Sequence, residues 1–304
     1  MRILVVGAGA VGGYFGGRLL EKGEDVTFLV REGRKKQLAE TGLVLESVHG
    51  NVTLTPKTIL SGEEADPFDL ILLSTKAYHL KGAIESFQEY VSEKTAILPL
   101  LNGISHYHQL IAEFGEERVL GGLCFIETTL DQEGRIIQTS VKHDLVFGER
   151  SGERTERVLK IEDAFSGTKV GYRLSDDISR DLWNKYLFIS TMSGITTLMR
   201  APIGPIREQS SGRAVITKLL EEIVFVMKHA GAPFSDDAVA QQLNQIDSLG
   251  YSMKSSMQRD MEKLSQVEAD HLHGYLLDIA NKEKILVPVL EAVYTNLKVY
   301  ETAL

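Results

Sequence analysis

A glycine-rich turn near the N-terminus constrains the fold of this chain more than any other feature. The segment "RILVVGAGAVGG" joins a short apolar run to a set of glycines, and helical spacing then continues to Gly23. A second apolar run, "DVTFLVR", follows directly. A strand, a tight glycine turn, a helix and a second strand within about 30 residues are typical of a βαβ unit in a parallel sheet.

The spacing of the glycines predicts a binding site for a dinucleotide. Gly7, Gly9 and Gly12 form the pattern G-x-G-x-x-G between a predicted strand and a predicted helix. The first glycine allows a tight turn, the second lets the backbone approach a pyrophosphate, and the third lets helix and strand pack closely. The helix N-terminus adds free N–H groups and the positive end of its dipole. The cofactor-binding candidates in this turn are Gly7, Ala8, Gly9, Ala10, Val11 and Gly12.

The residue that ends the second strand distinguishes one dinucleotide from the other. An Asp or Glu at this place would accept a hydrogen bond from the ribose 2′-hydroxyl of NAD, whereas this run ends in Arg31. A guanidinium suits a 2′-phosphate by its charge and its paired donors, so NADP(H) is the expected cofactor. A register shift of one residue would place Glu32 there instead, which leaves NAD as an alternative.

Charge and cysteine content exclude several classes of function. The net charge of −9 argues against broad binding to the phosphate backbone of nucleic acid. No apolar run approaches the roughly 18–20 residues of a membrane span. The single cysteine, Cys124, excludes an intrachain disulfide and fits a reducing compartment. We therefore expect a cytoplasmic protein that binds neither nucleic acid nor a membrane.

The 304 residues divide into two parts with different patterns of predicted secondary structure. Strand and helix patterns alternate to about Ser175, and helical spacing dominates afterwards, with "APIGPI" as a break. We therefore predict an α/β domain over residues 1–175 and an all-helical domain over residues 176–304. Within the first domain, "RVLGGLCFIETTL" and "RIIQTSVKHDLVFGE" are joined by a short turn, which predicts an antiparallel hairpin at the edge of the sheet.

Polar residues at two strand ends and in the helical half are further candidates. Lys76 and Asn102 each follow a predicted buried strand, and ligands of open α/β sheets bind at the carboxyl ends of strands. Lys185 lies in the apolar segment "LWNKYLFI", where spacing alone favours a lysine that reaches out to solvent. The acidic and histidine residues of "EADHLH" do not share one face of an α-helix, so we predict no metal site.

Seven segments in this order resemble the ketopantoate reductase (2-dehydropantoate 2-reductase) family: "GAGAVGG", Arg31, "TKA", "NG", "LWNK", "SSMQRD" and "EADHLHGYLL". The resemblance implies a Rossmann-type domain followed by a helical domain like that of 6-phosphogluconate dehydrogenase, with the active site in the cleft between them. It implies that NADPH reduces the C2 carbonyl of ketopantoate, a 2-oxo acid, to pantoate for pantothenate and coenzyme A biosynthesis. A homodimer follows from the same analogy.

The resemblance also implies roles for individual residues. Lys185 would polarise the carbonyl and donate the proton, and Glu268 would hold the substrate and the lysine. Asn102 would lie at the catalytic centre, in reach of substrate and cofactor, and Lys76 would lie beside the cofactor. Ser256 would bind the substrate carboxylate, a helix cap being its alternative role.

One departure from the family pattern concerns the substrate. The family commonly carries two asparagines after the lysine, four residues apart, where this chain has Ile189 and Ser193. Ser193 keeps a hydroxyl and is retained as a substrate-binding candidate, whereas Ile189 offers no hydrogen bond. A reductase of a different 2-oxo acid therefore stays open as an alternative. A non-catalytic NADP(H)-sensing protein with the same fold is a second, separate alternative.

Overall fold

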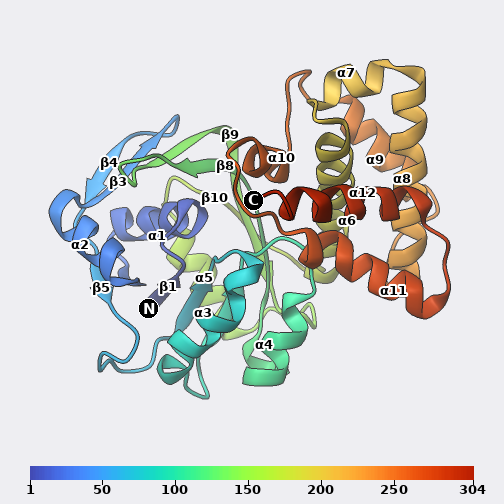
Figure 1. Cartoon of the computed structure of the whole chain (residues 1–304). Helices are drawn as coiled ribbons and strands as arrows, with labels where there is room; N and C mark the ends of the chain where they lie inside the picture. The colour runs from blue at the N-terminus through green and yellow to red at the C-terminus, as the bar shows by residue number, and fades with distance from the viewer. The chain divides into compact units, whose positions relative to one another are not determined.

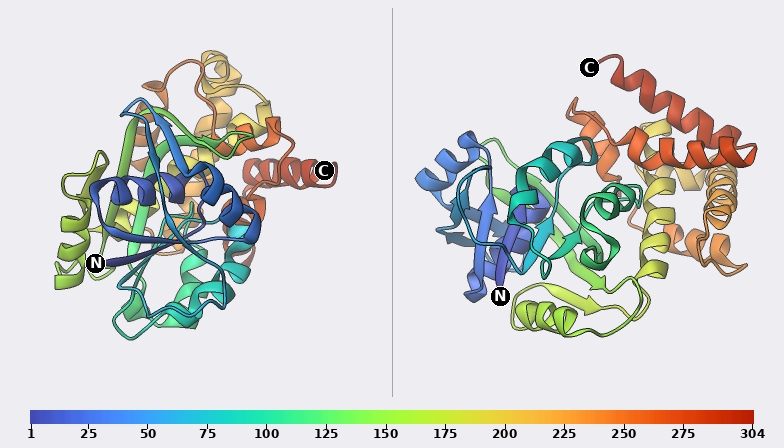
Figure 2. Two further views of the ribbon diagram at one scale, coloured as in Figure 1. Left: turned by 90° about the vertical axis from the view of Figure 1, so that its left-hand side faces the viewer. Right: turned by 90° about the horizontal axis from the view of Figure 1, so that it is seen from below.

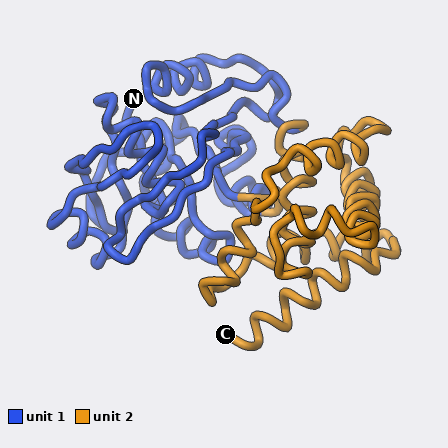
Figure 3. Tube along the Cα trace, turned by 90° about the horizontal axis from the view of Figure 1, so that it is seen from above, with its two compact units in different colours: residues 1–101, 106–179 blue, residues 102–105, 180–304 orange.

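The computed structural model describes all 304 residues, which divide into two compact units (Figure 3). The sheet unit comprises Met1–Leu101 and His106–Ser179. The helical unit comprises Arg180–Leu304 together with four residues from the first half of the chain, Asn102–Ser105.

A five-stranded parallel sheet forms the first layer of the sheet unit, in the order β5-β2-β1-β6-β7 (Figure 1). Its strands are β1 (Arg2–Val6), β2 (Asp25–Leu29), β5 (Lys57–Ile59), β6 (Leu70–Leu73) and β7 (Ala96–Pro99). Strands β6 and β7 are buried throughout, as expected for continuous apolar runs covered on both faces. The associated helices are α1 (Ala10–Lys22), α2 (Glu32–Thr41), α3 (Leu80–Phe87) and α4 (His106–Phe114), with short 3₁₀ turns at Ala77–His79, Gln88–Tyr90 and Glu116–Arg118.

A second, mixed sheet corrects one sequence prediction. Its strands are β3 (Leu43–Ser47), β4 (Val52–Leu54), β8 (Gly121–Leu130), β9 (Ile136–Gly148) and β10 (Gly171–Leu174), and α5 (Glu156–Phe165) precedes β10. Strands β8 and β9 form the predicted antiparallel hairpin. Contrary to the prediction, this hairpin does not lie at the edge of the parallel sheet. It belongs to the second sheet, where β9 also pairs in parallel with β3 and β10.

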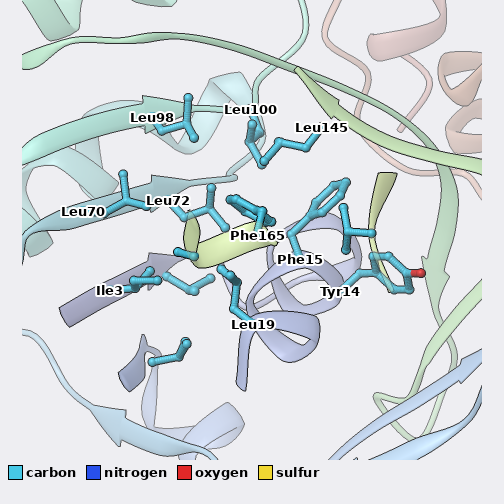
Figure 4. Packing of buried hydrophobic residues seen from close by; sticks show 14 of the residues in the cluster. Ile3, Tyr14, Phe15, Leu19, Leu70, Leu72, Leu98, Leu100, Leu145 and Phe165 are labelled. Carbon is cyan, nitrogen blue, oxygen red and sulfur yellow. The ribbon is translucent and has the colours of Figure 1, made fainter. Parts of the chain in front are cut away.

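Helix α1 packs against both sheets through its glycines. A Cβ added at Gly16 would lie 2.6 Å from Val5 of the parallel sheet, and one added at Gly13 would lie 2.5 Å from Ile136 of the mixed sheet. Figure 4 shows Phe15 and Leu19 of this helix among side chains from both sheets. The glycine run therefore gives the first helix a close fit on two sides.

The helical unit contains α6 (Ile178–Met199, whose first two residues belong to the sheet unit), α7 (Ile203–Glu208), α8 (Ser210–His229), α9 (Ala238–Asp247), α10 (Ser256–Glu262), α11 (Tyr275–Glu283) and α12 (Pro288–Glu301). These helices pack on one another without any strand (Figure 2). The segment "APIGPI", predicted as a break, overlaps the start of α7. Pro202 caps this helix and Pro205 lies in its first turn, where a missing N–H group costs no intrahelical hydrogen bond. A π-helical turn, Asp270–Gly274, precedes α11. No helix combines the length and apolarity that crossing a membrane requires.

Candidate functional site

The glycine turn after β1 has two glycines that packing requires and one that it does not. Gly7 has φ +91°, and a Cβ there would lie 2.3 Å from the carbonyl oxygen of Ser74. A Cβ on Gly12 would lie 2.3 Å from the Gly7 oxygen. A Cβ on Gly9 would meet nothing within 4 Å, although Gly9 stands directly before helix α1.

This open space beside Gly9 fits a dinucleotide pyrophosphate. Neighbouring side chains do not explain a glycine there, whereas a phosphate approaching the backbone does. The first turn of α1 has N–H groups without intrahelical partners and contains no acidic residue that would repel an anion. The residues present therefore suit the cofactor that the motif predicts.

The segment that carries Lys76 runs beside the glycine turn. The backbone N–H of Ser74 donates to the Val6 oxygen over 2.8 Å, so the chain after β6 continues next to the chain after β1. Lys76 is half-buried and precedes the 3₁₀ turn at Ala77–His79. Its segment therefore lies at the carboxyl ends of the strands, as the sequence predicted.

Arg31 lies between the end of β2 and the start of α2. The strand ends at Leu29, two residues earlier than predicted, and Arg31 immediately precedes α2, whose first residue is Glu32. Arg31 is exposed, and its guanidinium makes no hydrogen bond or ion pair within the chain, whereas its backbone oxygen accepts from the Lys35 N–H over 2.9 Å. Glu32 is exposed as well.

The other basic residues of this region are engaged elsewhere. Lys35 forms an ion pair with Glu63, with Nζ and Oε1 2.6 Å apart. Arg34 donates to the Gly134 oxygen over 2.8 Å, and its burial lowers the pKa of the guanidinium. Arg31 is therefore the better candidate for a 2′-phosphate.

Lys185 is buried, which corrects the interpretation from spacing alone. Its side chain lies on α6 with 8% relative exposure, beside the fully buried Tyr186 and Leu187. An ammonium in such surroundings loses hydration, so a lysine without a chemical or structural task is rarely found there. The fold therefore keeps this lysine, a residue of the helical unit, out of solvent.

Two buried hydrogen bonds join α6 to the π-helical turn that follows Glu268. The Tyr186 hydroxyl donates to the Leu272 oxygen over 2.5 Å, and Nε2 of His273 bonds to the Ser190 oxygen over 2.9 Å. Burial lowers the pKa of His273 to about 4, which keeps its imidazole neutral. The segments carrying Lys185 and the half-buried Glu268 are thus fixed to each other inside one unit.

Helix α10 is also bonded to α6, and its cap is the neighbour of the predicted serine. The Ser255 hydroxyl accepts from the Gln258 N–H over 3.1 Å and lies 2.7 Å from Oγ1 of Thr196 on α6. Ser256 is the first helical residue and is exposed. The cap role therefore falls to Ser255, and the Ser256 hydroxyl stays accessible to a ligand.

Asn102 follows β7 but packs with the helical unit. Its side-chain amide is half-buried and makes no hydrogen bond within the chain. Its backbone oxygen accepts from Nε2 of His271 over 2.6 Å. Sequence reasoning singled out Asn102 and missed His271, because "EADHLH" suggested histidines only as metal ligands; the structure turns His271 and His273 to different backbone carbonyls.

The two departures from the asparagine pattern lie on α6. Ile189 is half-buried and packs against the apolar core of the helical unit, and Ser193 is 3% exposed. Neither residue offers the amide that the family pattern places there.

Comparison with known proteins assigns the chain to a family. The model "Ketopantoate reductase PanE/ApbA" matches residues 3–152, and "Ketopantoate reductase PanE/ApbA C terminal" matches residues 177–301. The chain belongs to the ketopantoate reductase family. It is 49% identical over 301 residues to the uncharacterized oxidoreductase YkpB of Bacillus subtilis (strain 168), with 99% of each chain covered.

Solved structures agree with this family assignment. A crystal structure of 2-dehydropantoate 2-reductase from Geobacter metallireducens GS-15 matches with a TM-score of 0.88 and 29% identity, covering 98% of this chain and 99% of that chain. The ternary structure of D-mandelate dehydrogenase with NADH and anilino(oxo)acetate shares the fold, with a TM-score of 0.88, 22% identity, and 100% and 99% coverage. The predicted α/β domain followed by a helical domain is thereby confirmed, and this ketopantoate reductase family member belongs to the oxidoreductases.

Proposed function

We propose that this member of the ketopantoate reductase family reduces the C2 carbonyl of a 2-oxo acid with NADPH, and that ketopantoate is its substrate. The observation that carries the proposal is the burial of Lys185, a residue of the helical unit. Reduction of a carbonyl builds negative charge on its oxygen. A fixed ammonium in a dry environment stabilises this charge as it forms and then donates a proton to the oxygen.

The cofactor side of the proposal rests on the glycine turn and Arg31. NADPH, when bound, supplies the hydride. The backbone at Gly9 and the N-terminus of α1 would hold its pyrophosphate, and the exposed, unpaired Arg31 would hold its 2′-phosphate. Lys76, beside the same turn, would contact the cofactor.

The substrate side rests on residues of the helical unit. Glu268 would orient the substrate and Lys185, and the accessible hydroxyl of Ser256 would bind the carboxylate. The Asn102 amide, which has no partner within the chain, would contribute a hydrogen bond at the reacting centre. Ser193 would contribute its hydroxyl from α6.

Ile189 supports a second candidate, the reduction of a different 2-oxo acid. A site that hydrogen-bonds a substrate hydroxyl rejects analogues lacking it, and an isoleucine cannot build such a site. If ketopantoate is not preferred, we infer that the preferred acid lacks the terminal hydroxyl of ketopantoate.

A substrate comparison tests both candidates. The purified protein and NADPH are mixed with ketopantoate or with 3-methyl-2-oxobutanoate, which has a similar branched skeleton without the hydroxymethyl group, and the loss of NADPH absorbance gives kcat/KM. A higher value for ketopantoate supports the first candidate, and a higher value for the other acid supports the second. Tight NADPH binding without turnover of any 2-oxo acid would contradict both and favour a sensor.

A further inference from the structure

The four residues Asn102–Ser105 form a turn that packs with the helical unit. Gly103 has φ +74°, a conformation that favours glycine. A Cβ at this position would also lie 3.0 Å from Leu272 and 3.3 Å from Nε2 of His271. The Asn-Gly turn therefore lies directly against the π-helical turn that follows Glu268.

His271 bonds to both ends of this turn. Its Nε2 lies 2.6 Å from the Asn102 oxygen, and its Nδ1 lies 2.7 Å from the Ser105 hydroxyl oxygen. A backbone carbonyl only accepts hydrogen bonds, so Nε2 carries the proton. In the neutral ring Nδ1 is then the acceptor, and the Ser105 hydroxyl donates to it. Burial lowers the pKa of His271 and so favours this neutral form.

We propose that His271 is a positioning residue that aims the Asn102 amide at the reacting centre by holding the backbone of Asn102 and the hydroxyl of Ser105. This role rests on the proposed function, because the aimed amide has a task only if a ligand is bound there. Fixing the Asn102 carbonyl fixes the peptide plane that contains the Asn102 Cα, the atom that carries the side chain. A displacement of about 1 Å at such a residue costs up to about 100-fold in rate.

The π-helical turn does not depend on His271 alone. Asp270, its first residue, bonds to the Tyr294 hydroxyl over 2.6 Å and to Lys298 over 3.0 Å, and these residues belong to α12. His273 ties the same turn to α6. Removing the His271 imidazole should therefore release the Asn102 turn and leave the π-helical turn in place.

A kinetic experiment tests the positioning role. His271→Leu should lower kcat roughly 10- to 100-fold, with the KM for NADPH changed less than about twofold. His271→Gln, whose amide reaches about as far as Nε2 and can donate to the same carbonyl, should recover most of this loss. In an Asn102→Ala background, His271→Leu should cost less than about twofold further, because it acts through Asn102. Full additivity of the two losses, or no rescue by glutamine, would overturn the proposal.

A second measurement does not depend on turnover. The ¹⁵N spectrum of histidine-labelled full-length protein should show His271 neutral, with the proton on Nε2, and Ser105→Ala should shift the Nδ1 resonance. A proton on Nδ1 would overturn the proposal. Glu283→Gln, at an exposed position of α11, is the control: it should leave the His271 signals and kcat unchanged. If the wild-type protein reduces no 2-oxo acid, the proposed function fails. The position of the His271 proton still tests separately whether His271 donates to the Asn102 carbonyl and accepts from Ser105.

Discussion

At the scale of single side chains, Lys185→Ala removes the buried ammonium from α6 and should separate binding from chemistry. We expect kcat to fall roughly 10²- to 10⁴-fold, the range for loss of a general acid, while NADPH affinity stays nearly intact. Steady-state kinetics and a fluorescence titration with NADPH measure the two effects. Lys218→Ala on α8, where the side chain is 56% exposed and paired with Glu221, is the control. Wild-type turnover in the Lys185→Ala variant would contradict the assignment of Lys185 as the proton donor.

Arg31→Ala tests the choice between the two dinucleotides. Loss of a charge-assisted bond to a 2′-phosphate should weaken NADPH binding by about 1.5–3 kcal/mol, roughly 10- to 100-fold, and change NADH binding little. Lys36→Ala provides a control, because Lys36 is 78% exposed and lies 4.0 Å from Glu40. An unchanged ratio of the NADPH and NADH affinities would contradict this role of Arg31 and favour Lys76 or Arg34 as the residue that binds the 2′-phosphate.

At the scale of elements, the glycine turn offers a matched pair of substitutions. Gly9→Ala places a methyl group in open space, so stability should change by no more than about 0.5 kcal/mol while the Kd for NADPH rises about tenfold or more. Gly7→Ala combines φ +91° with a clash against the Ser74 carbonyl and should cost more than about 2 kcal/mol of stability. Urea denaturation and an NADPH titration measure both. Tight NADPH binding by a folded Gly9→Ala protein would contradict the assigned cofactor cradle.

The start of α12 is capped by a carboxylate from α8. Glu222 is 4% exposed and accepts from the N–H groups of Val289 and Leu290, over 3.0 and 2.9 Å. Glu222→Ala leaves these donors without their acceptor and should lower the free energy of unfolding by about 1–3 kcal/mol. Glu221→Ala next to it, 53% exposed, should change it by no more than about 0.5 kcal/mol.

Glu222 also predicts a pH dependence of stability. Burial raises the pKa of this carboxyl above its unfolded value, so the folded state binds the proton more tightly. Its contribution to stability therefore falls as pH rises from the unfolded pKa through the raised folded pKa. Glu222→Gln keeps an acceptor and does not titrate, so the stability of this variant relative to wild type should increase across that window. Urea denaturation at a series of pH values checks the sign, and a relative stability that falls with pH would contradict it.

How far the sequence predicts these elements depends on the range of the interactions. The glycine turn, α1 and the buried strands β6 and β7 follow from local pattern, and the structure has them. The three-residue strands β4 and β5 are too short for a periodicity to show. The mixed sheet depends on pairing between β9 and strands distant in sequence, which no local pattern records.

The candidate site shows the same division. Spacing points to Lys76 and Asn102 because both follow apolar strands. It misplaces Lys185 at the surface, because the burial of this residue depends on tertiary packing that local spacing does not record. It assigns no role to His271, whose partners Asn102 and Ser105 lie about 170 residues earlier and meet it only through tertiary packing.

At the scale of the whole molecule, each unit has its own hydrophobic core. Units with separate cores need not unfold together, so we expect calorimetry to resolve two transitions. The single tryptophan, Trp183, lies in the helical unit and reports that unit alone. NADP⁺ at 100 times its Kd should stabilise the sheet unit by about 2.7 kcal/mol and raise the temperature of the transition that tryptophan fluorescence does not follow. A single calorimetric transition that coincides with the fluorescence change would contradict this independence.

The excursion of Asn102–Ser105 has a consequence for protein engineering. A chimera that exchanges the C-terminal half at residue 180 would leave these four residues behind with the donor of the N-terminal half. His271 of the transplanted half would then face a foreign turn. A recombinant enzyme that swaps substrate specificity along this boundary has to transfer the short loop as well, as a second, discontinuous graft.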